Sequence, residues 1–276
     1  MAANLKRDET VGACVIEDSQ VSAGGGSILI NKMKARNMAN AAKPNEQVGW
    51  EMIWQRSHDH PRYGRSAEPD PAVVEWAKTI PAQGLVLDLG CGVGRHIVYL
   101  AGRGFRMAGV DISPSGIRLT QEACRDRQLA FEGHVSDMNA LIWADETFDA
   151  VLSTSTIHHH PREGIIRTLG EVRRVLKPGG QLLADFPSTD GVDYSLMRSR
   201  VSAGQIAEIE PNTFVDQRAN LHDIDDKFLP HHYCDEADLR DLLGSFEIIR
   251  LWTSLREHKD GWGTRSKWVA SARKPL

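Results

Sequence analysis

The sequence predicts an α/β fold with a mostly parallel sheet, on three observations. From residue 72 onward, short runs of aliphatic and β-branched residues alternate with longer segments of helical spacing. A glycine or an aspartate closes each short run, as in repeated βα units. The 276 residues, 41% of them hydrophobic, are enough to bury a core without disulfides. One domain of more than about 200 residues is as compatible with this length as two smaller ones.

Seven segments are predicted as strands, because they are rich in aliphatic or β-branched residues and end at turn residues. They are residues 85–89, 106–110, 130–135, 148–153, 181–186, 246–251 and 266–272. Helical spacing predicts five helices, over residues 70–79, 95–101, 115–128, 162–175 and 236–243. Strands and helices therefore alternate along most of the chain.

Two segments fall outside this alternation. Residues 1–45 mix small and polar types without a sustained period, so we expect a flexible N-terminal tail. Trp50, Ile53 and Trp54 share helical spacing, which places the start of the folded domain, residues 46–276, near this point. Residues 188–233 are too many for an ordinary connection between a strand and a helix. We expect them to form a lid or a substrate-binding insertion.

Composition limits the partners and the location. The 33 Lys and Arg residues face 37 Asp and Glu residues, so no overall positive field attracts nucleic acid or an anionic membrane. The longest apolar runs are far shorter than the ~20 residues that span a bilayer. Residues 1–8 are polar where a secretory signal would be apolar, and the four cysteines form no C-x-x-C pair. We expect a cytoplasmic protein with reduced thiols, and its oligomeric state is left open.

The strongest chemical signal is a strand that runs into three alternate glycines, Gly90, Gly92 and Gly94, and then into a helix. Such glycines let backbone N–H groups approach a ligand closely. A dinucleotide fingerprint needs a further glycine at position 95, where this chain has Arg95, so the pattern disfavours an NAD-dependent oxidoreductase. Asp111 ends the next strand, 21 residues after Gly90, and could accept both hydroxyls of a ribose.

These motifs resemble those of the class I S-adenosylmethionine-dependent methyltransferases, small-molecule type. The resemblance covers most of residues 50–273 and occurs in the family's order, at residues 86–94, 111–112, 136–138, 148–153 and 175–180. It implies a Rossmann-like sheet of seven strands with the last strand antiparallel and helices on both faces. It also implies S-adenosyl-L-methionine as the cofactor and residues 46–276 as the methyltransferase domain.

The resemblance carries cofactor-binding roles onto matching positions. These are the glycine-rich loop, the ribose acid and its neighbour, the segment after the third strand and the end of the fourth strand: Asp88, Gly90, Cys91, Gly92, Gly94, Asp111, Ile112, Asp137, Met138, Ser153 and Thr154. Asp137 could instead cap a helix. Residues 50–63 resemble the helix that covers the cofactor in thiopurine and tellurite methyltransferases, which adds Tyr63, although helically spaced tryptophans are also ordinary core residues.

Methyl transfer requires a nucleophile held in line with an activated methyl group, and sometimes a base. His158 and His159 follow the fourth strand at the edge where open α/β sheets bind ligands, and His232 and Tyr233 close the insertion. We take these four residues as catalytic candidates, although the first two could be packing residues of the cofactor pocket. The clusters His158-His159-His160 and His231-His232 could instead build a metal site, but no histidine pair has the i, i+4 spacing of a helical metal motif, so we expect no metal.

The sequence therefore predicts methylation of a small molecule at O, N, S or C. Residues 153–156 lack the Asn/Asp-Pro-Pro-aromatic motif of enzymes that methylate base amines. The acidic insertion would suit a cationic or amine-bearing substrate, although such charges are often only a solvated surface. The alternatives are a non-catalytic S-adenosylmethionine sensor and a protein or RNA methyltransferase.

Overall fold

The computed structural model describes residues 46–57, 64, 68–216, 226–257 and 263–276. The chain divides into two units, Met1–Lys43 and Pro44–Leu276, and every described helix and strand belongs to the second. The expected tail over residues 1–45 and the predicted cofactor residue Tyr63 lie outside the described residues.

Seven strands form one sheet in the order β3-β2-β1-β4-β5-β10-β9. Pairing is parallel from β3 across to β5, and β10 is antiparallel to both of its neighbours. The prediction of seven strands with the last one antiparallel is confirmed. The strands are β1 Leu85–Leu89, β2 Arg106–Asp111, β3 Phe131–Val135, β4 Phe148–Ser153, β5 Leu176–Pro187, β9 Glu247–Glu257 and β10 Thr264–Arg273.

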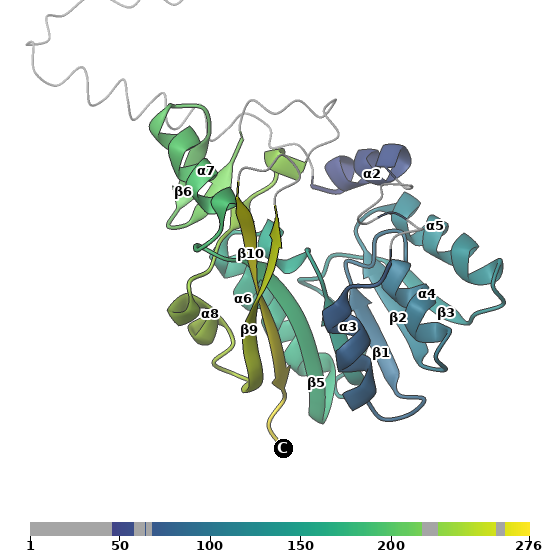
Figure 1. The fold of residues 1–276 in the computed structure, drawn as a ribbon. Helices are drawn as coiled ribbons and strands as arrows, with labels where there is room; N and C mark the ends of the chain where they lie inside the picture. Colours follow the sequence, from purple (N-terminus) through teal and green to yellow (C-terminus); the bar gives the residue numbers. More distant parts are fainter. Residues whose placement is uncertain (1–45, 58–63, 65–67, 217–225, 258–262) are drawn as a thin grey trace, which may run out of the picture. The chain divides into compact units, whose positions relative to one another are not determined.

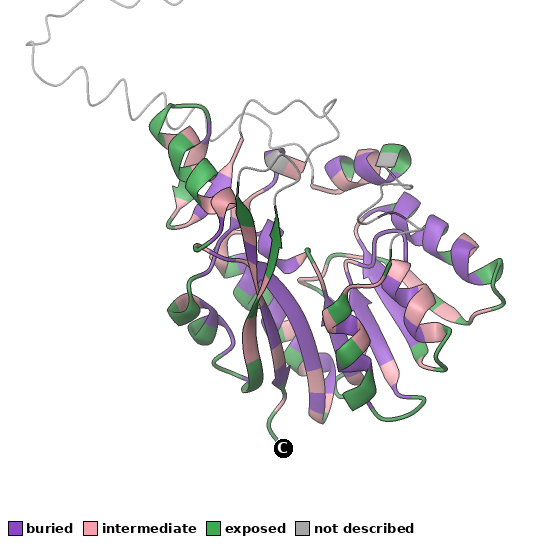
Figure 2. Cartoon of the chain, viewed as in Figure 1, coloured by how far each residue is buried: buried purple, intermediate pink, exposed green. Residues whose placement is uncertain are grey.

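Helices cover both faces of the sheet, because alternate residues of each central strand point to opposite sides. On β1, Leu87 and Leu89 pack with α6 (Arg162–Val175) and α8 (Glu236–Leu242). Val86 packs on the other side with α3 (Pro71–Trp76), α4 (Arg95–Ala101) and α5 (Pro114–Arg125). The central strands β1, β2 and β4 are almost entirely buried, and the edge strands β3 and β9 are partly or fully exposed (Figure 2).

The predicted element bounds differ from the observed ones at the ends of several elements, most of all at β9, which continues to Glu257 where the prediction ended at 251. β1, β4, α4 and α6 match the predicted ranges. The helix predicted over 70–79 is α3 followed by the short 3-10 helix η1 Ala77–Thr79. β5 starts five residues earlier than predicted, at Leu176, because Leu176 pairs with Phe148 directly after α6 ends.

Two further groups of elements lie at the edge of the sheet where the parallel strands end (Figure 1). One is α2 Glu46–Ser57. The other is the insertion, which has its own helix and a three-stranded sheet in the order β6-β7-β8. Its elements are α7 Val192–Ser202, β6 Ala207–Glu210, β7 Thr213–Val215, η3 Asp226–Phe228 and β8 His231–His232. None of the described helices combines the length and the apolar character that a bilayer crossing needs.

Candidate functional site

The loop after β1 turns sharply through Gly90, Gly92 and Gly94, whose φ angles are +69°, +55° and +83°. This left-handed region is open to glycine and strained for other residues. The N–H groups of Gly90 and Cys91 donate to the carbonyl of Val110 at 2.8 and 3.0 Å, which holds the loop against the end of β2. The glycines are thus required by the backbone path.

Asp111 lies at the end of β2 and is bound to this loop. Its Oδ2 accepts a 2.8 Å hydrogen bond from the N–H of Gly92, and its Oδ1 accepts one of 2.8 Å from the N–H of Ser113. Burial raises the pKa of Asp111 to about 6; these two hydrogen bonds oppose the rise, and the charge of Glu51 adds to it. The carboxylate is therefore oriented by backbone donors and retains acceptor capacity for a ligand.

A second buried carboxyl group, Asp88 on β1, lies in the same region. Burial raises its pKa to about 7, the guanidinium of Arg95 lowers it, and the charge of Asp111 raises it further. Cys91, next to the loop glycines, is buried, and burial and these two carboxylates raise the pKa of its thiol. The cysteine is thus poorly suited to act as a nucleophile.

Helix α2 packs across this loop. Glu51 accepts hydrogen bonds from the hydroxyls of Ser113 and Ser115, both 2.6 Å, and from the N–H of Ser115 at 2.9 Å. Burial raises the pKa of Glu51, but these hydrogen bonds outweigh that effect and lower it. The carboxylate thus caps the first turn of α5, where the helix dipole favours a negative charge.

Trp54 of α2 lies directly on the glycine loop. A methyl group built on Gly92 would be 2.6 Å from Cζ2 of Trp54, and one on Gly116 would be 3.2 Å from its Cδ1. Trp54 also packs with Val93 and Leu119. The helix expected to cover the cofactor region thus does lie over the loop.

The end of β4 contributes a row of hydroxyl groups. Ser153 donates to the carbonyl of Leu89 at 3.3 Å, and Thr154 Oγ1 lies 3.3 Å from Nδ1 of His96. The N–H of Ser155 donates to Asp185 Oδ1 at 2.6 Å, and Lys267 Nζ lies 3.2 Å from Asp185 Oδ2. β1, β4, β5 and β10 therefore all supply polar groups to one edge of the sheet.

The predicted adenine-side residues lie at the ends of β2 and β3. The N–H of Ser136 donates to the carbonyl of Asp111 at 3.1 Å, so these two strand ends are adjacent. Asp137 is exposed, and its Oδ1 accepts from the N–H of Asn139 at 2.8 Å in a turn rather than a helix cap. Met138 is partly buried against the core, and Ile112 is partly exposed.

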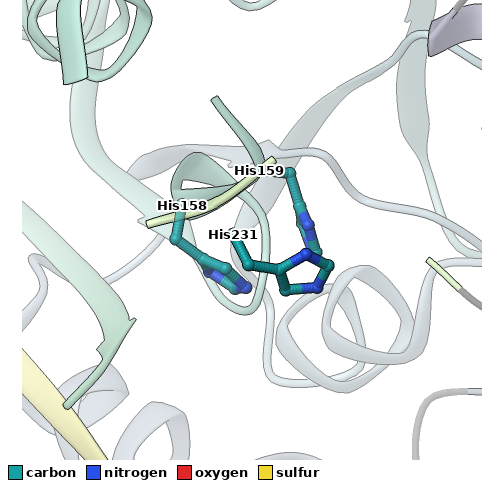
Figure 3. Close-up of side chains that lie close together, drawn as sticks. All are labelled: His158, His159 and His231. Atoms are coloured by element: carbon teal, nitrogen blue, oxygen red, sulfur yellow. The ribbon is translucent and has the colours of Figure 1, made fainter. Parts of the chain in front are cut away.

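Three of the histidines at this edge gather into a cluster. His158 and His159 lie on η2 Ile157–His159, and His231 lies on β8, with ring centroids 4.2 Å apart for the first pair and 4.5 Å apart for His159 and His231 (Figure 3). Burial, and then the neighbouring histidines, lower the pKa of His158 well below its usual value and that of His159 to about 3. Trp50 of α2 contacts His159 edge to face, with centroids 5.0 Å apart.

The other two catalytic candidates, His232 and Tyr233, are held by contacts with the insertion and with α8. His232 has Nδ1 2.7 Å from Thr213 Oγ1 and Nε2 2.8 Å from Asp238 Oδ2. Both ring nitrogens are thus in hydrogen bonds, which is typical of a structural histidine. Tyr233 is buried with Tyr194 and Phe214, and burial raises the pKa of its phenol. Base roles for these residues remain predictions.

Sequence reasoning selected neither Glu51 nor Asp226, and it noted His231 beside His232 and Tyr233 but kept only the latter two as catalytic candidates. His231 and His232 are neighbours on a strand, so their side chains point to opposite sides, and the sequence does not reveal which side faces the sheet edge. Glu51 and Asp226 carry no motif. Their roles depend on which segments meet in the fold.

Comparisons with known proteins agree with the fold described above. Residues 86–180 match the model of a family described as methyltransferase domain. A SAM-dependent methyltransferase structure from Methanosarcina mazei superposes with a TM-score of 0.63 at 25% identity, over 76% of this chain and 99% of that one.

Two curated relatives are similar over shorter stretches. The chain is 32% identical over 138 residues to mouse tRNA (carboxymethyluridine(34)-5-O)-methyltransferase, covering 47% of this chain and 20% of the relative. It is 36% identical over 124 residues to 2-methyl-6-phytyl-1,4-hydroquinone methyltransferase from Synechocystis, covering 43% of this chain and 38% of the relative. The chain thus spans less than half the length of each of these two relatives.

Proposed function

This chain carries a class I S-adenosylmethionine-dependent methyltransferase domain, and on that premise we propose that it transfers a methyl group from S-adenosyl-L-methionine to a small molecule. The cofactor would lie along the loop from Gly90 to Gly94, with its ribose on Asp111. Its sulfonium group supplies a methyl group that is already activated for displacement.

The observation that carries this proposal is the pair of buried carboxyl groups beside the glycine loop. Asp88 and Asp111 are 2% and 7% exposed, and both have raised pKa values. Buried carboxylates favour a cationic ligand, because a positive charge offsets their desolvation. S-adenosylmethionine carries a sulfonium and an ammonium group against one carboxylate, so its net charge is positive, whereas NAD brings two phosphate charges.

A small-molecule substrate is favoured by what surrounds the sheet edge. α2 contacts the insertion there: a methyl group built on Gly49 would lie within 2.2 Å of the Phe228 ring. Trp50 of α2 and His231 of the insertion both contact His159, which follows β4, and residues 188–233 are proposed to select the substrate. The charge balance also offers no positive field for RNA. The hydroquinone relative supports a small substrate, and the tRNA relative supports the alternative.

The chain's own residues would act mainly by positioning. A group whose pKa is about 3, such as His159, is a weak base at neutral pH, so His158 and His159 are better suited to shape the pocket than to remove a proton. Holding the nucleophile in line with the methyl group and excluding water are then the principal contributions. The proposal also includes residues 46–276 as the methyltransferase domain and a cytoplasmic location, which rests on the sequence.

Calorimetric titration of the full chain with S-adenosylmethionine, S-adenosylhomocysteine and NAD tests the cofactor. Micromolar binding of the first two without NAD binding is expected. Absence of S-adenosylmethionine binding would overturn the proposal. Release of S-adenosylhomocysteine is then followed with panels of quinols, fatty acids, amines and unmodified tRNA. Turnover of tRNA alone would replace the proposed small-molecule substrate with RNA. Binding of S-adenosylmethionine without turnover of any substrate would favour a sensor.

A further inference from the structure

Imidazoles from two separate parts of the chain meet at the edge of the sheet. His158 and His159 follow β4, and His231 comes from β8 of the insertion (Figure 3). Each ring offers one nitrogen, and these three atoms lie within 4.8 Å of one another. His158 and His159 are 5% and 3% exposed, so their rings are held inside the protein rather than at its surface.

His231 is oriented by contacts at both of its ring nitrogens. Its Nδ1 lies 3.0 Å from the carbonyl oxygen of Leu229 and must donate its proton there, because a carbonyl only accepts. Its Nε2 lies 3.5 Å from Oδ1 of Asp226. A backbone carbonyl that orients a histidine in this way is a common second partner of metal-binding imidazoles.

Asp226 lies beside two of the three rings. Its Oδ2 is 3.8 Å from Nε2 of His159, and its Oδ1 faces His231. Nδ1 of His158 and Nδ1 of His159 are buried and meet no hydrogen-bond partner in the described part of the chain.

We propose that His158, His159 and His231 bind one divalent transition-metal ion of the zinc class, with Asp226 as the fourth ligand. Three imidazoles and one carboxylate form a set that suits Zn²⁺. Tetrahedral zinc with bonds of about 2.0–2.1 Å to nitrogen holds two nitrogens about 3.3 Å apart, so the rings must approach by up to roughly 1.5 Å. Rotation of the imidazoles about their side-chain bonds can supply this movement.

The position of the cluster indicates what the ion would do. Two ligands follow β4, and the other two lie in the insertion, so the ion would fasten the insertion to the sheet edge. Four protein ligands leave no open position, which is the arrangement of a structural zinc site. Spacing along the chain predicted no metal, because these ligands come together only in the fold.

The test is zinc binding by the full chain after its metal has been stripped with a chelator. Zn²⁺ is titrated in competition with a chromophoric chelator, and Co²⁺ is used in parallel to record the visible absorption of a tetrahedral site. One equivalent of tight binding is expected. His231→Asn and His159→Asn should each weaken it on the order of 100-fold, and Asp226→Asn at least tenfold. Zinc should also raise the melting temperature of the unchanged chain but not of the histidine variants.

Two control variants separate this cluster from other histidines. His134→Asn alters an exposed ring paired with Glu132, and His232→Asn disrupts the neighbouring group of His232, Cys234 and Asp238. Both should bind zinc as the unchanged chain does. Equal affinity in the unchanged chain and in His231→Asn, or loss of binding only in His232→Asn, would overturn the proposal. Because the His231 side chain is 16% exposed, its variant is the least expected to unfold, and circular dichroism checks this.

S-adenosylmethionine binding is measured on the same samples. In the unchanged chain it reports on the glycine loop and Asp111, none of which is a ligand of the proposed metal site. Failure of zinc binding with intact cofactor binding would refute only the metal site, and the opposite result would refute only the cofactor proposal.

Discussion

The N–H of Gly92 donates a 2.8 Å hydrogen bond to Oδ2 of Asp111. This bond joins the loop after β1 to the end of β2, and a second bond from the N–H of Ser113 fixes the other carboxylate oxygen. The acid is therefore held in one orientation by the backbone before any ligand arrives, so little ordering is left for the binding step.

Asp111→Asn should weaken S-adenosylmethionine binding at least tenfold, or about 1.4 kcal/mol, because it removes a charged acceptor. Isothermal titration of both proteins measures the change. Asp126→Asn, at an exposed position after α5, is the matched control and should bind normally. Equal affinities for the Asp111 variant and the unchanged protein would remove the ribose role from Asp111.

Gly92→Ala should abolish cofactor binding, because the new methyl group meets the Trp54 ring at 2.6 Å within the loop. Gly104→Ala separates this contact from backbone strain. Gly104 has a φ of +88°, and a methyl group there would meet nothing within 4 Å. Both variants should lose roughly 1–2 kcal/mol of unfolding free energy from the left-handed backbone, but only the first should lose binding. Cofactor binding by Gly92→Ala at unchanged affinity contradicts the proposed pocket.

Cofactor affinity should rise between about pH 5.5 and 7.5, with proton release on binding. In the ligand-free protein the pKa of Asp111 is about 6 and that of Asp88 about 7. A bound cation favours the ionised forms and lowers both pKa values, so binding is weakest where they are protonated. Titrations in buffers of different ionisation enthalpy count the protons. A cofactor affinity that stays constant or falls between about pH 5.5 and 7.5 would contradict this prediction.

Without ligand, Asp88 and Asp111 make the free energy of unfolding fall as the pH rises. Their folded pKa values lie above those of the unfolded chain, so they make the fold less stable as pH rises from about 4 to 7. Added S-adenosylmethionine should therefore raise the melting temperature more at pH 7.5 than at about pH 5.5.

Glu51→Gln should lower the unfolding free energy by about 1 kcal/mol, because it removes the charged cap from α5. Hydrogen exchange should become faster at the first turn of α5 and in α2. Glu75→Gln is the control. The side chain of Glu75 forms an exposed ion pair with Lys78, and both residues belong to the α3–η1 segment. Unchanged exchange in α5 would show that Glu51 does not hold the two helices together.

Local patterns were sufficient for the central strands and the glycine loop, whereas the antiparallel last strand was implied only by the family resemblance. β1 and β4 were predicted to the residue because their aliphatic runs are bounded by turn residues, and three alternate glycines signalled the loop that the φ angles require. The small sheet of the insertion was not predicted, because strands of two to four residues are too short to show a period.

Site residues were predictable from the sequence only where they lie at, or directly after, the end of a strand. Asp111 and Thr154 belong to that group, since the carboxyl ends of parallel strands share one edge. Glu51 reaches the site from α2 and His231 from β8, so their participation depends on tertiary packing. The choice between His231 and His232 depends on the orientation of one short strand.

The place of β10 also sets the order in which the sheet can be completed. β10 follows every other strand in the chain, yet it lies between β5 and β9 and pairs with both. As the chain emerges during synthesis, β9 has no neighbour in this sheet until β10 has been made. The paired residues of β10 and β5 lie 80 to 92 positions apart in the sequence, from Lys267 with Pro187 to Arg273 with Gln181, and such long-range pairing slows folding. The sheet therefore closes late, and an unfinished chain would expose an unpaired edge of β5.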